Sequence, residues 1–271
     1  MRLWILSALL VLVLGGASWA TIKRHRETKW LKAYREASDS YERFHYADAE
    51  VQLRSILPNA RKWWPAGRQL ANTLNLLALV YSSENRFGEA EPLYDQAIAI
   101  LERQPAGSSL DLGKTYANEG NVFLKEGKLE DAQHRFSQAL AIYQQNLEAA
   151  GVERGSVLHS LGVLRAIQRR YSEAQPLMQD GLKIYEQYLP PAHPDLAQAY
   201  LDLAGLLRLE GQPTEANEYD RKALAIQQKL FGKDSAVVRE TELRLGSASG
   251  KSSTTKSMSP DKHSARAAST K

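Results

Sequence analysis

The chain of 271 residues contains no cysteine, and this absence narrows the chemistry that it can carry. Without a thiol there is no disulfide scaffold, no thiolate metal site, no iron–sulfur cluster and no cysteine nucleophile. Catalytic signatures are missing as well: GxxxxGK[ST], GxGxxG, GxSxG and HExxH do not occur, and the six histidines are dispersed. We therefore expect a protein that is not an enzyme, with no catalytic residues, no cofactor and no metal site.

A basic region of the kind that binds nucleic acid is missing from the middle of the chain. The formal net charge is +4, and it comes from the two ends. Residues 1–29 and residues 246–271 each have a net charge of +4, which leaves residues 30–245 with a net charge of −4. Because this middle region offers no basic footprint for a phosphate backbone, we expect no nucleic-acid partner.

One long run without a charge is present at the N-terminus, from Leu3 to Ile22 (LWILSALLVLVLGGASWATI). A helix of this length spans about 30 Å, the thickness of the hydrocarbon core of a bilayer. Trp19 near its end and the basic cluster KRHR after it are typical of a helix end at a membrane surface. We therefore expect residues 1–22 to be an uncleaved single-pass anchor followed by a basic juxtamembrane segment, residues 23–31. The charge distribution places the body on the cytoplasmic side.

The same segment also fits a secretory signal peptide. Arg2 is then the charged start, Leu3 to Leu14 the apolar stretch, and Ser18-Trp19-Ala20 a small-x-small cleavage site. In this alternative the mature protein begins at Thr21 and is periplasmic or secreted. Basic residues directly after a cleavage site resist translocation, which favours the anchor.

The last 26 residues, 246–271, contain eight serines and three threonines and almost no apolar side chains. Such a stretch cannot bury enough apolar area to offset the entropy lost when it becomes ordered. We expect a disordered, basic, Ser/Thr-rich tail.

Between the two ends, one phrase recurs five times with almost constant spacing. It reads NRFGEAEPLYDQAIAI around Ala90, and the corresponding alanines of the copies are separated by 41, 42, 42 and 42 residues. Each alanine follows an acidic residue and has another small residue twelve positions before it. The five alanines are Ala49, Ala90, Ala132, Ala174 and Ala216. A fixed period of this length predicts an array of repeated structural units.

Each copy has the pattern of two helices joined by a short turn, with apolar residues at helical spacing. Small residues at the fixed positions let the two helix backbones approach closely. Asn85, Gly127 and Gly211 tolerate the left-handed conformation that ends a helix, and Phe44 and Arg169 depart from this pattern in the first and fourth copies. Pro92 and Pro176 fall in the first turns of second helices, where we expect a missing N–H to cost little.

On these residues the middle of the chain resembles the tetratricopeptide repeat (TPR) family. The small residues Ala78, Ala90 and Ala97 carry the family pattern, the period is typical of kinesin light chains, and Glu119 departs by replacing a usual leucine. The resemblance implies an all-α fold, a right-handed superhelical solenoid of about five antiparallel helix pairs preceded by the N-terminal apolar helix. The expected repeat domain is residues 32–245, with repeats at 32–68, 69–110, 111–152, 153–194 and 195–236 and a cap helix at 236–245.

The resemblance also implies a concave groove, lined by the first helix of each pair, that receives a peptide or a helix of a protein partner. Placing the copies on the family pattern assigns nine residues to this groove: Asn72, Asn75, Leu79, Ser82, Lys114, Asn121, Lys125, His159 and Arg208. Asparagine can bond a peptide backbone, and lysine and arginine can pair with carboxylates. We therefore expect a protein or peptide partner with acidic residues.

The function expected from the sequence is that of a non-enzymatic protein–protein interaction scaffold, held at a membrane through residues 3–22. Two alternatives stay open. The first is an exported adaptor whose signal peptide has been cleaved. The second is a structural repeat protein that associates with further copies of itself.

Overall fold

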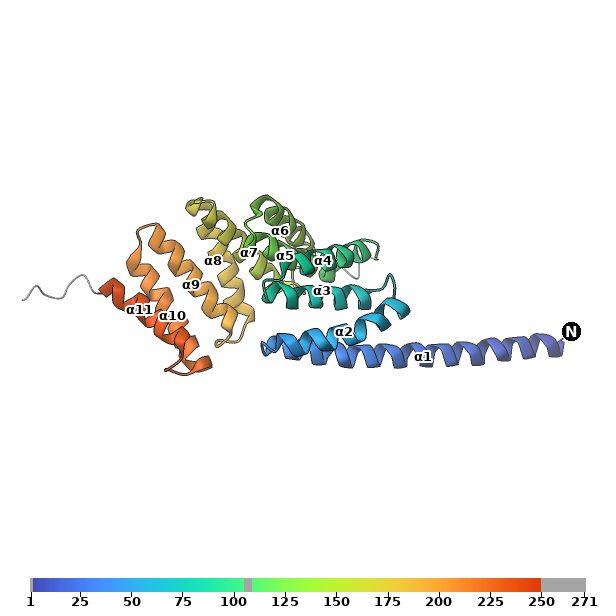
Figure 1. Ribbon diagram of the computed structural model, residues 1–271. Coiled ribbons are helices and arrows are strands. Elements are labelled where there is room, and N and C mark those ends of the chain that lie inside the picture. The colour runs from blue at the N-terminus through green and yellow to red at the C-terminus, as the bar shows by residue number, and fades with distance from the viewer. Residues whose placement is uncertain (1, 105–108, 250–271) are drawn as a thin grey trace, which may run out of the picture. The chain divides into compact units, whose positions relative to one another are not determined.

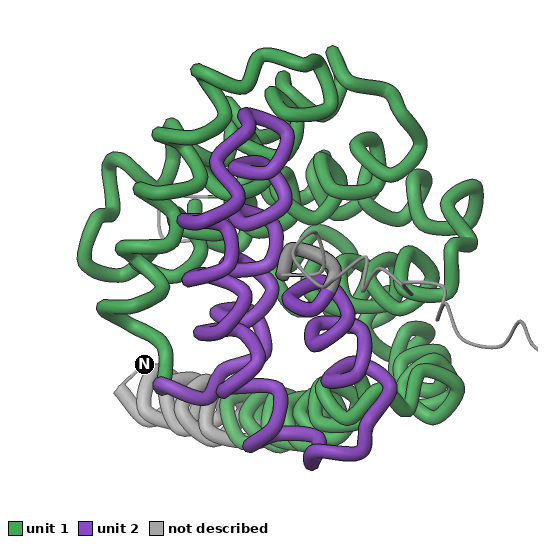
Figure 2. Tube along the Cα trace, turned by 90° about the vertical axis from the view of Figure 1, so that its left-hand side faces the viewer, with its two compact units in different colours: residues 1–190 green, residues 191–271 purple. Residues whose placement is uncertain are grey.

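The computed structural model describes the backbone of residues 2–104 and 109–249, and the side chains of residues 19–104 and 109–246. These residues form eleven α-helices and no strand, so the expected all-α fold is confirmed. The chain divides into two compact units, Met1–Pro190 and Pro191–Lys271, which are coloured separately in Figure 2. The predicted tail lies outside the described residues from residue 250 onward.

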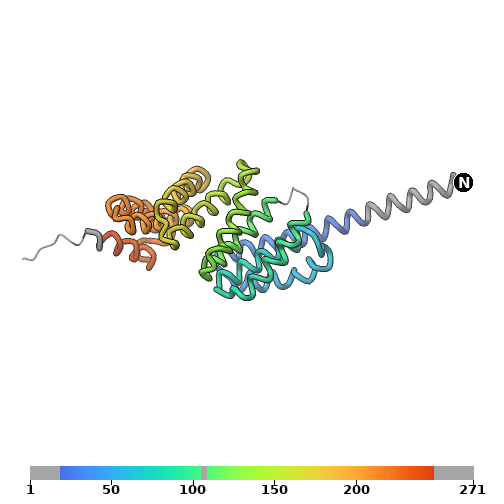
Figure 3. The backbone as a smooth tube through the Cα atoms, turned by 90° about the horizontal axis from the view of Figure 1, so that it is seen from above, coloured from blue at the N-terminus to red at the C-terminus, as the bar shows by residue number. Residues whose placement is uncertain are grey.

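The first unit contains four consecutive helix pairs (Figure 1). The pairs are α1 (Arg2–Glu42) with α2 (Tyr46–Trp63), α3 (Arg68–Ser83) with α4 (Phe87–Leu101), α5 (Ser109–Lys125) with α6 (Leu129–Gln144), and α7 (Gly151–Ile167) with α8 (Tyr171–Tyr188). Each helix packs against the next one in the chain, so the pairs follow one another in sequence order (Figure 3). Further contacts join the first helices of neighbouring pairs, α1 with α3, α3 with α5 and α5 with α7.

The second unit contains one pair, α9 (Pro194–Leu209) with α10 (Pro213–Phe231), and a last helix, α11 (Ala236–Ser249), which packs against α10. The buried Thr241 hydroxyl of α11 donates a hydrogen bond of 2.8 Å to Oε1 of Gln227. Because this bond satisfies two polar groups inside the contact, it helps to fix α11 on α10.

The small residues at the fixed positions lie where the two helices of a pair touch, and the five alanines that define the period are fully buried. Among the glycines at these contacts, the tightest position lies between α7 and α8. A Cβ atom on Gly162 would lie 2.3 Å from Cγ of Met178, and one on Gly181 would lie 2.8 Å from the backbone oxygen of Gly155. These positions therefore require glycine for a steric reason.

A left-handed residue ends the first helix of every pair. The residues are Phe44, Asn85, Gly127, Arg169 and Gly211, with φ between 59° and 78°. In each turn the backbone N–H of the following residue donates to the carbonyl five residues earlier, as in Arg86 to Tyr81 (2.8 Å) and Arg170 to Arg165 (2.9 Å). The predicted conformation is confirmed at Asn85 and the two glycines, and it persists where the residue is neither glycine nor asparagine.

The two prolines lie deeper in their helices than expected. Pro92 and Pro176 are the sixth residues of α4 and α8, so neither takes the place of one of the four N–H groups that lack a partner at a helix start. The expectation for these prolines is therefore wrong. In α4 the carbonyl without a helical donor is that of Gly88, which is exposed and can bond water instead.

The predicted anchor, residues 1–22, lies mostly outside the described side chains, which begin at Trp19. In the part of the chain with described side chains, no helix is long and apolar enough to cross a bilayer. The backbone of α1 is helical from Arg2 to Glu42. The anchor and the signal peptide both stay predictions.

Candidate partner-binding face

Polar side chains join the first helices of neighbouring pairs in the first unit. Nδ2 of Asn118 on α5 donates to Oδ1 of Asn75 on α3, and Oγ of Ser160 on α7 donates to Oδ1 of Asn121 on α5, both at 3.1 Å. Nε1 of Trp30 on α1 donates to Oγ1 of Thr73 on α3 at 3.0 Å. Each bond links residues about one repeat apart, so successive first helices use equivalent sides for these contacts.

On the side that carries these bonds, the helix α5 presents a stripe of polar side chains. The stripe consists of Lys114, Asn118, Asn121 and Lys125, whose spacing places them on one helix face. The two amides in the middle are half-buried and bonded to α3 and α7. The two lysines at the ends are exposed, and among the described residues neither ammonium has an ion-pair partner.

We name the side of α3, α5 and α7 that carries this stripe the first-helix face. It is defined by Asn72, Leu79, Lys114, Asn118, Asn121, Lys125 and Ser160. On α3, Asn72 and Leu79 are half-buried at the repeat positions of Lys114 and Asn121. Leu79 also packs against the core that the first two pairs share. The face thus combines fixed amides, a hydroxyl, free cations and an apolar side chain.

Ser82, one of the predicted groove residues, points into its own helix pair. Its buried hydroxyl donates to the carbonyl of Ala78 at 2.7 Å and lies 3.3 Å from the hydroxyl of Tyr94 on α4. The neighbouring Ser83 is the residue that faces another first helix, since its hydroxyl lies 3.2 Å from that of Tyr41 on α1. The assignment of Ser82 to the groove is therefore wrong by one residue, or about 100° of helix rotation.

Arg208 occupies the position of Ser82 three repeats later, on α9 of the second unit, and it also faces its own pair. Its guanidinium pairs with the buried carboxylate of Asp220 on α10 and donates to Oδ1 of Asn217 at 3.1 Å. The charge of Arg208 is therefore already used inside the pair, and its role in the groove stays a prediction.

Two further predicted residues have structural partners. Asn75 is buried, and its side-chain oxygen accepts the bond from Asn118, so that it joins two helices. His159 lies against α8: its Cβ is in the region that a Cβ on Gly181 would reach, and its ring centroid is 6.4 Å from that of Tyr185. Asn75 thus serves as a link between α3 and α5, and the predicted place of His159 in the groove stays a prediction.

Asn118 and Ser160 belong to the face but were not predicted. A signal for Asn118 exists in the sequence, since it follows Asn75 by 43 residues, close to one period. Two amides one period apart on successive first helices can reach each other across neighbouring repeats, and amide pairs satisfy both donor and acceptor.

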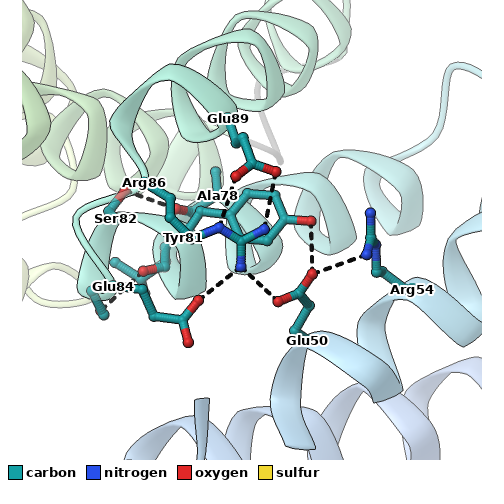
Figure 4. A network of polar contacts seen from close by, with 10 residues as sticks. Glu50, Arg54, Ala78, Tyr81, Ser82, Glu84, Arg86 and Glu89 are labelled. Atoms are coloured by element: carbon teal, nitrogen blue, oxygen red, sulfur yellow. Dashed lines mark hydrogen bonds and ion pairs between the residues drawn. The ribbon is translucent and has the colours of Figure 1, made fainter. Parts of the chain in front are cut away.

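A cation at the turn of the second pair acts as a joint to the first pair. Arg86, between α3 and α4, donates to Glu50 of α2 (2.7 Å), to Glu84 (2.9 Å) and to Glu89 (2.8 Å), and it lies over the ring of Tyr81 (Figure 4). The hydrogen bond from Arg86 is the main cause that lowers the pKa of Glu50. Paired, ionised carboxylates of this kind have no proton to transfer near neutral pH.

The next repeat has an equivalent joint. Lys128 takes the place of Arg86, and its ammonium lies 2.6 Å from Oε1 of Glu91 on α4 and 3.0 Å from Oε2 of Glu126. The hydrogen bond from Lys128 is the main cause that lowers the pKa of Glu91. Glu50 and Glu91, which are one repeat apart, are therefore both structural partners of cations.

One carboxyl differs from all of these. Glu119 of α5 is 1% exposed, and its Oε2 lies 2.5 Å from Nε of Arg135 on α6. Burial raises the pKa of Glu119 to about 7, although Arg135 acts in the opposite direction. Among the described residues there is no group of three or more histidine or acidic side chains that could hold a metal ion. The Glu119 carboxyl is thus a buried packing feature, with no reactive group beside it.

A sequence model of the tetratricopeptide repeat family matches residues 69–145 and 153–229, which together make up more than half of the chain. No curated protein is similar enough in sequence to match the chain.

Several solved structures share the fold at low sequence identity. BtubC (BKLC) from P. vanneervenii is 19% identical with a TM-score of 0.57, and 82% of each chain is covered. The nearly identical TPR-like repeats of a Podosopora anserina protein assigned as a kinesin light chain are 20% identical with a TM-score of 0.57, over 74% of this chain and 96% of that one. For pilF of Pseudomonas aeruginosa the values are 21% and 0.54, over 82% and 90%. The predicted likeness to repeats of the kinesin-light-chain type is confirmed.

Proposed function

Because the chain belongs to the tetratricopeptide repeat family, we propose that it is a non-enzymatic scaffold that binds a peptide or a helix of a partner protein on the first-helix face. The observation that carries the proposal is the stripe on α5, in which two fixed amides stand between two exposed lysines. Fixed amides can bond a peptide backbone at a low entropic cost, and ammonium groups without internal partners can pair with carboxylates. A partner segment with acidic residues fits this arrangement.

The spacing of the two cations narrows the choice of segment. Lys114 and Lys125 are eleven residues apart on α5, about 16 Å along the helix axis. A partner that lies along α5 can meet both lysines with carboxylates about five residues apart in an extended strand, or about three turns apart in a helix. We also infer that the four pairs of the first unit wind as a right-handed superhelix, which the family resemblance supports and which small-angle scattering of that unit can test.

We further propose that residues 3–22 tether this scaffold to a membrane, with the body on the cytoplasmic side. The proposal is supported by the length of the uncharged run and by the basic residues that follow it. The alternative of an exported, processed adaptor predicts a mature N-terminus at Thr21. N-terminal sequencing of the membrane-associated protein and protease shaving of spheroplasts separate the two.

Site-specific crosslinking tests the binding face. The chain has no cysteine, so a single introduced cysteine carries a photoreactive benzophenone at one known position. We compare Lys125→Cys, on the first-helix face, with Ser137→Cys, which is also exposed and lies on α6. We expect a specific adduct at residue 125 and none at residue 137, and mass spectrometry of the adduct identifies the partner.

Charge reversal provides the control for this experiment. We expect Lys114→Glu with Lys125→Glu to abolish capture of that partner while the far-UV circular dichroism stays unchanged, because both side chains are exposed. Equal adducts from residues 125 and 137, or unchanged affinity after charge reversal, would show that the partner binds elsewhere. Self-association is the alternative if the adduct is a second copy of the chain, and size-exclusion chromatography over a dilution series then gives the oligomeric state.

A further inference from the structure

Four of the five tryptophans of the chain gather at one end of the first helix pair. Trp19 and Trp30 belong to α1, and Trp63 and Trp64 lie at the end of α2. The ring centroids of Trp63 and Trp64 are 5.6 Å apart and those of Trp30 and Trp64 are 6.3 Å apart. Trp19 is 65% exposed. Trp30, Trp63 and Trp64 are half-buried beside it, and a partly exposed aromatic patch of this kind marks an interaction surface.

Two cavities open between α1 and α2 beside these rings. One has a volume of about 410 Å³ and the other of about 260 Å³, and Ile22, Arg26 and Trp63 line both. The second cavity is also bounded by Trp19 and Trp64. The lining of the two cavities therefore combines aromatic and apolar side chains with the cations Lys23, Arg26 and Lys29.

The cations around these cavities outnumber the acidic residues. Six exposed basic residues stand on the two helices: Lys23, Arg24, Arg26, Lys29, Arg61 and Lys62. Glu27 is the only acidic residue in residues 19–35, and residues 51–68 have none. Among the described residues, none of these six cations has an ion-pair partner. Two of them lie over aromatic rings, the Arg26 guanidinium 5.0 Å from Trp63 and the Lys23 ammonium 5.5 Å from Trp19.

Tryptophan rings beside lysine and arginine are the side chains that the interface between a bilayer and water prefers, because the ring lies at the level of the headgroups and the cations meet phosphate. The position of these side chains along α1 agrees with a location at the membrane interface. Arg26, which contacts Trp63, is four residues beyond Ile22, the last residue of the uncharged run, or about 6 Å along the helix. The headgroup layer on each side of a bilayer is about 5–8 Å thick. A helix that crosses the bilayer up to Ile22 therefore brings the end of α2 into that layer.

We propose that Trp63, Trp64 and the surrounding cations form a docking surface for anionic phospholipid headgroups. This inference rests on the proposed tether and adds a second contact to it. With one contact, the repeat array can tilt about its anchor. With α2 also seated on the bilayer, the array is held at one angle, and the first-helix face is presented in a fixed direction to partners.

A fluorescent probe at a single cysteine tests the surface in the full chain. Ala66→Cys, exposed and two residues after Trp64, carries an NBD group, and Ser137→Cys on α6 carries the same group as a matched control. Both proteins are reconstituted into phosphatidylcholine vesicles and into vesicles with about 30% phosphatidylglycerol. In anionic vesicles we expect a blue shift at residue 66 with quenching by a headgroup-labelled nitroxide lipid, a clearly smaller effect in neutral vesicles, and no effect at residue 137.

Two variants locate the cause of the signal. Arg61→Gln with Lys62→Gln changes only exposed side chains, so the fold is retained, and we expect at least a twofold loss of quenching at residue 66. Trp63→Ser with Trp64→Ser is expected to remove the signal while the protein still floats with the vesicles. A probe at residue 66 that reads as water in anionic vesicles, or a signal of equal size in neutral vesicles, overturns the proposal.

Flotation separates this inference from the tether. If the chain floats with both kinds of vesicle and residue 66 stays in water, the docking surface fails and the tether stands. If the chain floats only with anionic vesicles and the tryptophan variant sinks, the docking surface stands and the tether fails. If the chain floats with neither, both fail.

Discussion

The neighbouring pairs α5/α6 and α7/α8 fill the same repeat positions with opposite chemistry. In α7/α8 the facing positions are Leu161 and Leu177, which belong to one apolar cluster. In α5/α6 the same positions hold Glu119 and Arg135, an ion pair in which the carboxylate is buried and the guanidinium is half-buried. The two pairs also differ at the small position that corresponds to Ala97, where α8 has Gly181.

The difference shows that the period fixes where the helices touch but leaves open how the contact is stabilised. Close backbone approach and apolar burial stabilise α7/α8 at any pH. In α5/α6 the desolvation of two charges offsets much of their attraction. The nearby carboxylates of Asp95 and Glu91 add to this cost when Glu119 is ionised. The packing of α5, the helix that carries the proposed binding stripe, therefore depends on whether Glu119 is protonated.

The largest effect on stability is expected when a larger side chain is placed at the close contact between α7 and α8. The Cβ of Gly181→Val would meet backbone atoms, the oxygen of Gly155 at 2.8 Å and the nitrogen of His159 at 3.0 Å, neither of which can move aside. We expect a loss of about 3 kcal/mol in the free energy of unfolding, measured by urea denaturation. Gly88→Ala, with open space around it, is the control and should not destabilise the protein. A loss below about 1 kcal/mol for Gly181→Val would contradict the close packing.

The next effect is a pH dependence confined to α5/α6. The pKa of Glu119 rises from 4.5 to about 7 in the folded state, so folding favours the proton. This contribution to stability is complete below pH 4.5 and is lost as the pH rises through 7, up to about 3 kcal/mol in total. Hydrogen exchange measured by mass spectrometry at pH 5 and pH 8 should show the change in peptides of α5 and α6, after correction for the intrinsic exchange rate.

Glu119→Gln is the control for the pH dependence. Other carboxyls, such as Glu50, have lowered pKa values and act in the opposite sense, since their stabilisation is lost as the pH falls. The difference between the two proteins therefore isolates Glu119. The interpretation fails if the difference in stability stays constant between pH 4.5 and pH 8.

Making α5/α6 chemically like its neighbours should stabilise it. Glu119→Leu combined with Arg135→Leu replaces the ion pair by the leucine pair found in α7/α8, and we expect a gain of about 2 kcal/mol at pH 8. Arg135→Leu alone leaves the carboxyl buried without its partner and should destabilise the protein. If the double variant is less stable than the natural chain at pH 8, the ion pair is a net stabilising contact.

A smaller effect is expected at the joint between first helices. Asn118→Ala removes the donor to the buried Asn75, and we expect a loss of about 1 kcal/mol, because a buried polar group loses its hydrogen bond. A double-mutant cycle with Asn75→Ala measures the coupling of the two amides. Additive losses would mean that the two side chains do not act as a pair.

The smallest effect is expected at a turn. Arg169 has φ of 59°, a conformation that costs an L-residue about 1 kcal/mol, and its side chain is exposed. Arg169→Gly removes this cost but loses chain entropy, so we expect a net gain of about 0.5 kcal/mol by thermal unfolding. The reverse change at the equivalent position, Gly127→Arg, should destabilise the protein, and a stabilising effect there would contradict the argument.

The sequence predicted the helix pairs and their close contacts well, because the period and the small residues directly record where backbones approach. It predicted less well which side chains of the first helices face a neighbouring first helix. Ser82 and Ser83 are adjacent, yet one faces α4 and the other faces α1, since each residue turns a helix by about 100°. A period alone does not determine this rotation.

A comparison of the repeat copies with each other would have located more of these side-chain contacts. Residue 82 faces residue 94, and the same twelve-residue separation joins Arg208 to Asp220. In the same way, Glu119 and Arg135 stand where the two neighbouring copies have two leucines, so a paired exchange of both residues was visible in the sequence. The raised pKa of Glu119 was not visible in the sequence, because it depends on how completely the surrounding helices exclude water.

The left-handed turns have a consequence for how the array can change over evolutionary time. Each turn is closed by a bond between backbone groups, and it keeps its geometry with phenylalanine, asparagine, glycine or arginine at the critical residue. Side-chain identity is therefore nearly free at the turns and restricted at the joints, where partners such as Arg86 with Glu50 must match. When a repeat is duplicated or deleted, the joint residues of the repeats that become neighbours must still pair. The joint residues therefore restrict the order in which the repeats can follow one another.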